Sequence, residues 1–166
     1  MPGMTAKGTM ICVAFIAMSW AGYSLINRGM QRDSLPLKLR TGWFYAEGSC
    51  SRLLSHQGAF VFSLSKETVE TIKSDGMSFF EDIDTPENRA SRRYFSGEWK
   101  ETPVPASYFS DGMPPNLHCG HDQSWLWPRG IAEALKRPGG YYQSSGIRSL
   151  YVLPELGLVV ASASDR

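Results

Sequence analysis

The stretch "IRSLYVLPELGLVVASAS", Ile147 to Ser164, decides the fold of this chain. Two runs rich in β-branched and aliphatic residues, Arg148–Leu153 and Leu158–Ser162, flank the sequence "PELG". Proline and glycine in that order suit a tight reversal, so the two runs predict an antiparallel β-hairpin. The second arm is almost continuously apolar, as is typical of a strand covered on both faces.

The preceding segments complete an α+β domain. Thr41–Glu47 and Ala59–Ser65 are rich in aromatic and β-branched residues and predict two further strands. Ser65–Gly76 predicts a helix, because the serine can cap its first turn and the glycine can supply the left-handed residue that ends it. A second short helix is expected within Trp127–Gly140, with Pro128 in its first turn. We therefore expect a small antiparallel sheet with both helices on one face.

Glycine and proline predict where regular structure is interrupted. Gly48 and Ser49 are expected to end the first strand, and Cys50–His56 is expected to form a short helical turn or a loop. Four prolines fall within Glu101–Asn116, which argues against a helix or a central strand through that segment. An extended surface loop is expected there.

An apolar segment lies near the N-terminus. Residues 10–26, "MICVAFIAMSWAGYSLI", carry no charge and, as a helix, would extend about 25 Å, slightly less than a hydrocarbon core of about 30 Å. Ser19 and Ala21 also fit a cleavage site before Gly22. Residues 1–26 are thus expected to be a signal-anchor transmembrane helix or a signal peptide, and the anchor is preferred.

The rest of the chain is expected to be exported. Residues 27–40 are polar and predict a linker, and residues 41–166 predict a single exported α+β domain. The formal net charge is only +1 and no basic stripe is present, which argues against nucleic-acid binding. The expected location is the cell envelope. The protein would be single-pass and membrane-anchored through residues 10–26, or secreted or periplasmic after cleavage.

Two cysteines of the exported part are expected to pair. Cys12 lies inside the apolar segment, which leaves Cys50 and Cys119 as the other thiols of the chain. In an oxidising compartment an isolated pair of this kind most simply forms a disulfide. Cys119 belongs to the stretch "NLHCGHDQSW", Asn116 to Trp125, which is expected to form the turn into the second helix.

The same stretch leaves two alternatives open. His118, Cys119, His121 and Asp122, here called the histidine cluster, carry atoms that could bind a metal ion. The metal ligands in that alternative would be His118, His121 and Asp122. Cys50 could instead act as a nucleophile, with His118, His121 or His56 as its base and Asp122 nearby.

The preferred function is that of a small envelope protein that binds a protein partner, as an inhibitor, an immunity-type protein or an accessory subunit does. No GxSxG, HExxH or GxGxxG motif occurs, and no cofactor is expected. Tyr108, Phe109, Tyr141 and Tyr142 are the candidate partner-binding residues. The alternative is an exported hydrolase or metal-dependent enzyme centred on the histidine cluster.

Overall fold

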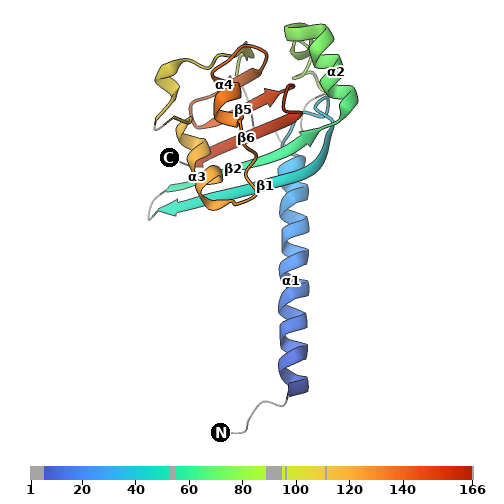
Figure 1. The fold of residues 1–166 in the computed structure, drawn as a ribbon. Coiled ribbons are helices and arrows are strands. Elements are labelled where there is room, and N and C mark those ends of the chain that lie inside the picture. Colours follow the sequence, from blue (N-terminus) through green and yellow to red (C-terminus); the bar gives the residue numbers. More distant parts are fainter. Residues whose placement is uncertain (1–5, 53–54, 89–94, 96, 111, 166) are drawn as a thin grey trace. The chain divides into compact units, whose positions relative to one another are not determined.

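The computed structural model describes residues 6–52, 55–88, 95, 97–110 and 112–165. It divides into two compact units, Met1–Arg32 and Asp33–Arg166, here called the helical unit and the body. The helical unit contains α1 (Ala6–Arg32). In chain order the body contains β1 (Thr41–Arg52), β2 (Ser55–Leu64), α2 (Lys66–Asp75), the 3-10 helix η1 (Gly76–Phe80), β3 (Lys100–Glu101), the 3-10 helix η2 (Ala106–Tyr108), α3 (Pro115–Gln123), α4 (Ile131–Leu135), β4 (Tyr141–Ser144), β5 (Arg148–Leu153) and β6 (Leu158–Asp165) (Figure 1).

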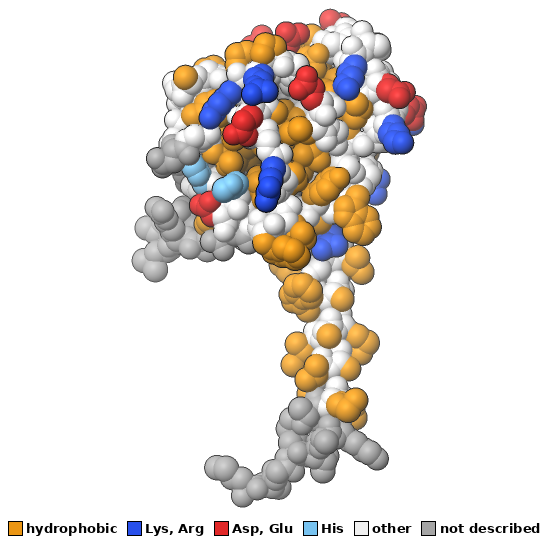
Figure 2. Space-filling view, in the orientation of Figure 1, with side chains coloured by type: hydrophobic (Ala, Val, Ile, Leu, Met, Phe, Trp, Pro, Cys, Tyr) orange, Lys and Arg blue, Asp and Glu red, His pale blue; other side chains and the backbone are white. Residues whose placement is uncertain are grey.

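Helix α1 extends beyond the apolar run that the sequence singled out. Its stretch Met10–Arg32 has 23 residues and a mean hydropathy of 1.6, so it is long and apolar enough to cross a membrane. At 1.5 Å per residue this stretch extends about 35 Å, slightly more than a hydrocarbon core. Apolar side chains cover much of its surface in Figure 2, whereas most charged side chains in that view belong to the body.

The body is built on one antiparallel sheet of six strands in the order β1-β2-β6-β5-β4-β3. The predicted C-terminal hairpin is confirmed: β5 pairs with β6 from Arg148↔Ala163 to Leu153↔Leu158. Strand β6 also pairs with β2 on its other side, so the last strand in chain order is a central strand. The α+β class is confirmed as well.

Side chains of β6 alternate between two separate hydrophobic cores. Val159 and Ala161 join the first core, and Leu158 and Val160 join the second. Because successive side chains of a strand point to opposite faces, the sheet is covered on both sides. That double burial explains the continuous apolar pattern of the second hairpin arm.

The helices consequently lie on opposite faces, and the expectation that they share one face is wrong. Ile72 of α2 packs in the first core, together with phenylalanines of η1. Leu117 of α3 and Leu135 of α4 pack in the second core. Since both faces of the central strands are apolar, each face needs its own cover.

The first strand does not end at Gly48 and Ser49. Strand β1 runs through both residues to Arg52 and pairs with β2 as a second hairpin, in place of the expected turn or loop. Gly48 is needed for packing instead. A Cβ atom there would lie 2.6 Å from the backbone oxygen of Cys119 in α3, which is closer than real Cβ contacts allow.

The segment expected to be a linker is ordered in the structure. Its first part, up to Arg32, belongs to α1. Leu35 and Leu39 are buried in the first core, and the backbone N–H of Leu37 donates to the backbone oxygen of Asn88. These alternating leucines bring residues 33–40 into the body.

Helix α2 matches its prediction closely. The N-cap Ser65 accepts a hydrogen bond from the backbone N–H of Thr68 at 3.1 Å, and Gly76 ends the helix with φ 60°. The expected second helix is shorter than predicted. Gly130 has a left-handed φ of 85°, so α4 begins after it and Pro128 lies outside the helix.

The proline-rich segment also differs in part. It contains η2 and the two-residue edge strand β3, and Pro115 begins α3 as its first residue. Proline is well tolerated there because its missing N–H group would have no partner in the first turn. The stretch "NLHCGHDQSW" is therefore mainly helical.

Candidate functional site

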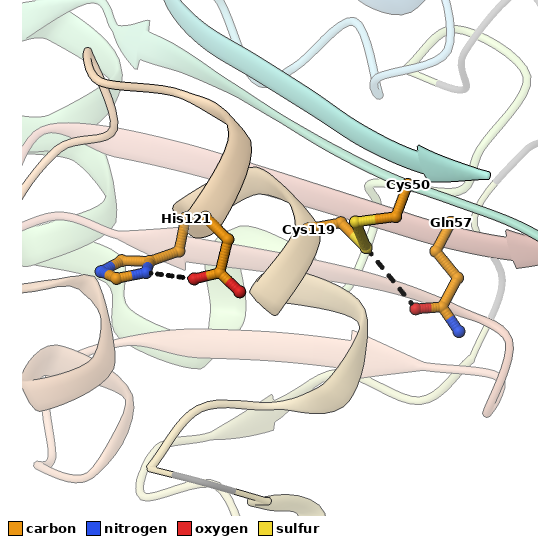
Figure 3. The surroundings of a disulfide bond; sticks show 5 residues. Cys50, Gln57, Cys119 and His121 are labelled. Atoms are coloured by element: carbon orange, nitrogen blue, oxygen red, sulfur yellow. Dashed lines mark hydrogen bonds and ion pairs between the residues drawn. A yellow bond between two sulfur atoms is a disulfide. The ribbon is translucent and has the colours of Figure 1, made fainter. Parts of the chain in front are cut away.

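The structure joins the two cysteines that the sequence pairs. Cys50 of β1 and Cys119 of α3 form a disulfide, with their Cα atoms 5.4 Å apart and a separation of 69 positions in the sequence (Figure 3). The bond connects an edge strand of the sheet to the helix that covers the second core. In this state neither sulfur is available as a nucleophile or as a metal ligand.

Close backbone packing holds α3 in the same place. Gly120 lies against the indole of Trp127, where a Cβ atom would come within 2.2 Å of Cζ3. Gly48 of β1 approaches the backbone of Cys119 and Gly120 in the same turn of α3. Two glycines and one disulfide therefore fix the position of the helix on the sheet.

Gln57 borders the disulfide. It faces Cys50 in the β1–β2 register, and its Oε1 atom lies 3.7 Å from Sγ of Cys119 (Figure 3). A disulfide sulfur carries no proton, so this approach is a van der Waals contact in the oxidised protein. The amide would accept a hydrogen bond from Cys119 only if the disulfide were reduced.

His118 has a structural partner. Its Nε2 atom lies 2.7 Å from the backbone oxygen of Ser110, in the loop before α3. A carbonyl oxygen can only accept, so Nε2 carries the proton and donates. This hydrogen bond ties the loop to the helix and fixes the tautomer of the ring.

His121 lies elsewhere on the helix. Its Nδ1 atom is 2.9 Å from Oδ1 of Asp122, and both side chains are exposed. Figure 3 shows His121 on the other side of α3 from Cys119, as two residues of separation on a helix require. Within the described parts of the chain, no group of three or more His, Cys, Asp or Glu side chains could hold a metal ion. The histidine cluster is therefore distributed around α3.

The four candidate aromatic residues separate into two pairs. Tyr141 and Tyr142 of β4 are only 9% and 6% exposed and pack in opposite cores, so the expectation that they bind a partner is wrong. Burial raises the pKa of both phenols. Tyr108 is exposed, whereas Phe109 packs against the second core with Nζ of Lys136 at 5.4 Å from its ring centroid.

A hollow next to α3 was not predicted from the sequence. It has a volume of about 320 Å³ and lies between the end of α3 and the start of α4. Trp125 and Trp127 line it together with His121, Arg129 and Glu133. Two tryptophans within three residues, in "SWLW", were the signal that could have revealed it.

Among the described residues of the body, Trp125 is the most exposed large apolar one, at 93%. Leu126 beside it is also exposed, and both follow directly after α3. Figure 2 shows histidine side chains at the surface of the body, next to an acidic side chain. The hollow therefore combines an exposed indole with side chains of both charge signs, which is a composition suited to binding.

Neither a protein-family model, nor a curated protein, nor a solved structure matches the chain, so its function is inferred from the residues and geometry described above.

Proposed function

We propose that the chain is a membrane-tethered protein of the cell envelope whose body acts by binding a protein partner. Inhibitors, immunity-type proteins and accessory subunits work in this way. Helix α1 would supply the tether, since it is long and apolar enough to cross a membrane. The disulfide between Cys50 and Cys119 supports an oxidising location for the body, because thiols in the cytosol are kept reduced.

The exposure of Trp125 is the observation that carries the proposal. A tryptophan that is 93% exposed leaves a large apolar ring in water, although burial of such a ring is favourable by several kcal/mol. Tryptophan and arginine are also the residues that most often dominate the binding energy of protein interfaces. Arg129 lines the same hollow.

The support beneath Trp125 strengthens this reasoning. The residue follows α3, which the disulfide and the Gly48 and Gly120 contacts fix on the sheet. A fixed backbone loses little conformational entropy on binding, so more of the contact energy remains as affinity. The hollow, at about 320 Å³, is large enough for one or two side chains of a partner.

Site-specific crosslinking tests the proposal. A photo-reactive amino acid replaces Trp125 in the full chain, and Leu156, which is exposed in the β5–β6 turn, is the matched control position. In native membranes we expect one discrete adduct from position 125 and none from position 156. Equal adducts from both positions, or none from position 125, would reject Trp125 as the centre of an interface.

A substitution provides the second test. Trp125→Ala should weaken co-purification of the crosslinked partner at least about tenfold, which corresponds to about 1.4 kcal/mol. The unfolding midpoint should not change, because the ring contributes little to the core. Leu156→Ala is the control and should leave partner binding intact. Protease added to cells whose outer layers have been opened while the cytoplasmic membrane stays intact should cleave the body, and protection there would argue against export.

A further inference from the structure

A second exposed aromatic surface lies on β1. Trp43 is 75% exposed and Tyr45 is 45% exposed. Phe44 between them packs against the first core. The β1–β2 register shifts on both sides of Phe44, and Trp43 and Tyr45 both remain exposed next to this core residue. We call this pair, with exposed Leu37 before it, the aromatic face.

We propose that the aromatic face rests in the headgroup region of the membrane that α1 crosses. The inference rests on the proposed membrane anchoring and assigns a second, independent membrane contact to the body. Tryptophan and tyrosine prefer this region because their rings are apolar and their N–H or O–H groups need polar partners.

The short connection after α1 supports a lipid surface as the partner that covers the aromatic face. Only Asp33 and Ser34 separate Arg32, the last residue of α1, from Leu35, which is buried in the first core. Three residues extend at most about 11 Å, so the core begins within that distance of the helix end. The stretch Met10–Arg32 exceeds the hydrocarbon thickness, which places the helix end at the interface.

The aromatic face follows closely within the body. Leu35 and Leu39 are buried in the first core, Phe44 packs against the same core, and Trp43 follows Leu35 by eight positions. Tight turns shorten the path, because Leu39 donates its backbone N–H to Pro36 at 3.0 Å. The covalent chain therefore limits how far the aromatic face can lie from the end of α1.

The charge of the segment fits anionic headgroups. Residues 27–45 contain four basic residues and one acidic residue, a net charge of +3, whereas residues 46–166 contain 12 basic and 15 acidic residues, a net charge of −3. Basic residues next to a membrane-spanning helix are attracted to anionic lipids. Lys38 pairs with Asp82 and Arg40 with Glu67. Because these ion pairs partly neutralise the two basic residues, we assign most of the energy of the membrane contact to the aromatic rings.

The local backbone of β1 disfavours a protein strand as the occupant. The β1–β2 register shifts between Thr41 and Phe44 and again between Phe44 and Ala46. Such bulges bend an edge strand and interrupt its hydrogen-bonding pattern, which hinders the addition of another strand. The half of β1 that carries the aromatic face is thus better suited to contact lipid than to pair with a strand of a second protein copy.

Fluorine NMR of the full chain in lipid nanodiscs tests the inference. The chain contains five tryptophans, and all are replaced by 5-fluorotryptophan. Trp→Phe variants assign the resonances of Trp20 in α1, Trp43 and Trp125. A spin-labelled lipid then broadens groups in the membrane, and a soluble paramagnetic agent broadens groups in water. Discs of neutral lipid and discs containing anionic lipid are compared.

We expect the labelled lipid to broaden Trp20 and Trp43 in both kinds of disc and the soluble agent to broaden Trp125. Broadening of Trp20 without Trp43 would overturn the inference and leave the anchoring intact. An unaffected Trp20 would overturn the anchoring and the inference together. A Trp43 resonance protected from both agents would indicate protein contact and would also overturn the inference.

Discussion

Removal of the Cys50–Cys119 disulfide should destabilise the body by a predictable amount. We consider Cys50→Ser, Cys119→Ser and the double variant. The two cysteines are 69 positions apart. For a loop of this length, the chain-entropy relation gives a restriction of the unfolded state worth about 4 kcal/mol. Total stabilities of domains are typically about 5–15 kcal/mol, so the loss is a large share.

The folded state should change little in these variants. The contact of Gly48 with α3 and the packing of Gly120 on Trp127 do not depend on the sulfur atoms. Each single variant already opens the loop, so the second substitution adds almost nothing. We therefore expect three similar losses, each of about 4 kcal/mol, and strongly non-additive single effects.

Urea unfolding of the full chain in mild detergent measures these losses, with near-ultraviolet circular dichroism as the signal of the aromatic cores. The midpoint should fall by roughly 2 M if the slope is about 2 kcal/mol per M. Cys12→Ser is the control and should have no effect, because this cysteine is free and exposed on α1. Additive losses in the two single variants would refute the reasoning. A reducing agent that does not change the unfolding midpoint of the wild-type protein would refute it as well.

Three further predictions concern packing, pH and capping. Gly120→Ala should cost about 1–3 kcal/mol by overpacking against Trp127, whereas Gly22→Ala in α1, with nothing within 4 Å, should cost nothing; equal unfolding midpoints would contradict the packing argument. Burial raises the pKa of Tyr151 to about 12, above its unfolded value of 10.0. Its contribution of roughly 3 kcal/mol should be complete below pH 10 and should be lost as the pH rises from 10 through about 12. Tyr151→Phe should remove this part of the pH dependence in urea titrations, and an unchanged profile would assign the effect to other groups. Ser65→Ala should lower the free energy of unfolding by about 1 kcal/mol through loss of the cap on α2, and Thr68 should then lose amide-exchange protection first.

The elements that the sequence predicted well depend on short-range signals. The hairpin of β5 and β6 has its turn and both arms within one stretch, and α2 has its own cap and its own terminating glycine. The pairing of Cys50 with Cys119 followed from counting thiols, which needs no knowledge of the fold. The hairpin and α2 depend on neighbouring residues, and the disulfide depends on the number of cysteines. A single sequence is therefore enough to predict them.

The errors came from contacts between distant segments. Gly48 was predicted to end a strand, because its contact with α3 involves residues about 70 positions later in the sequence. Tyr141 and Tyr142 were predicted to bind a partner because the sequence around them does not show that β3 and β5 flank them on the sheet. No periodicity within a short window carries that information. The hollow beside Trp125 is a different case, because nearly all of its lining comes from residues 121–133 and the two tryptophans there were a local signal.

The position of β6 at the middle of the sheet has a consequence for biosynthesis. The hairpin of β1 and β2 leaves the ribosome about 100 residues before the strand that completes it. Until then one long edge of that hairpin stays unpaired, and such non-local pairing is slow to form. The nascent polypeptide should therefore remain loosely structured during synthesis, and the proposed export of the body through a protein-conducting channel would require such a state.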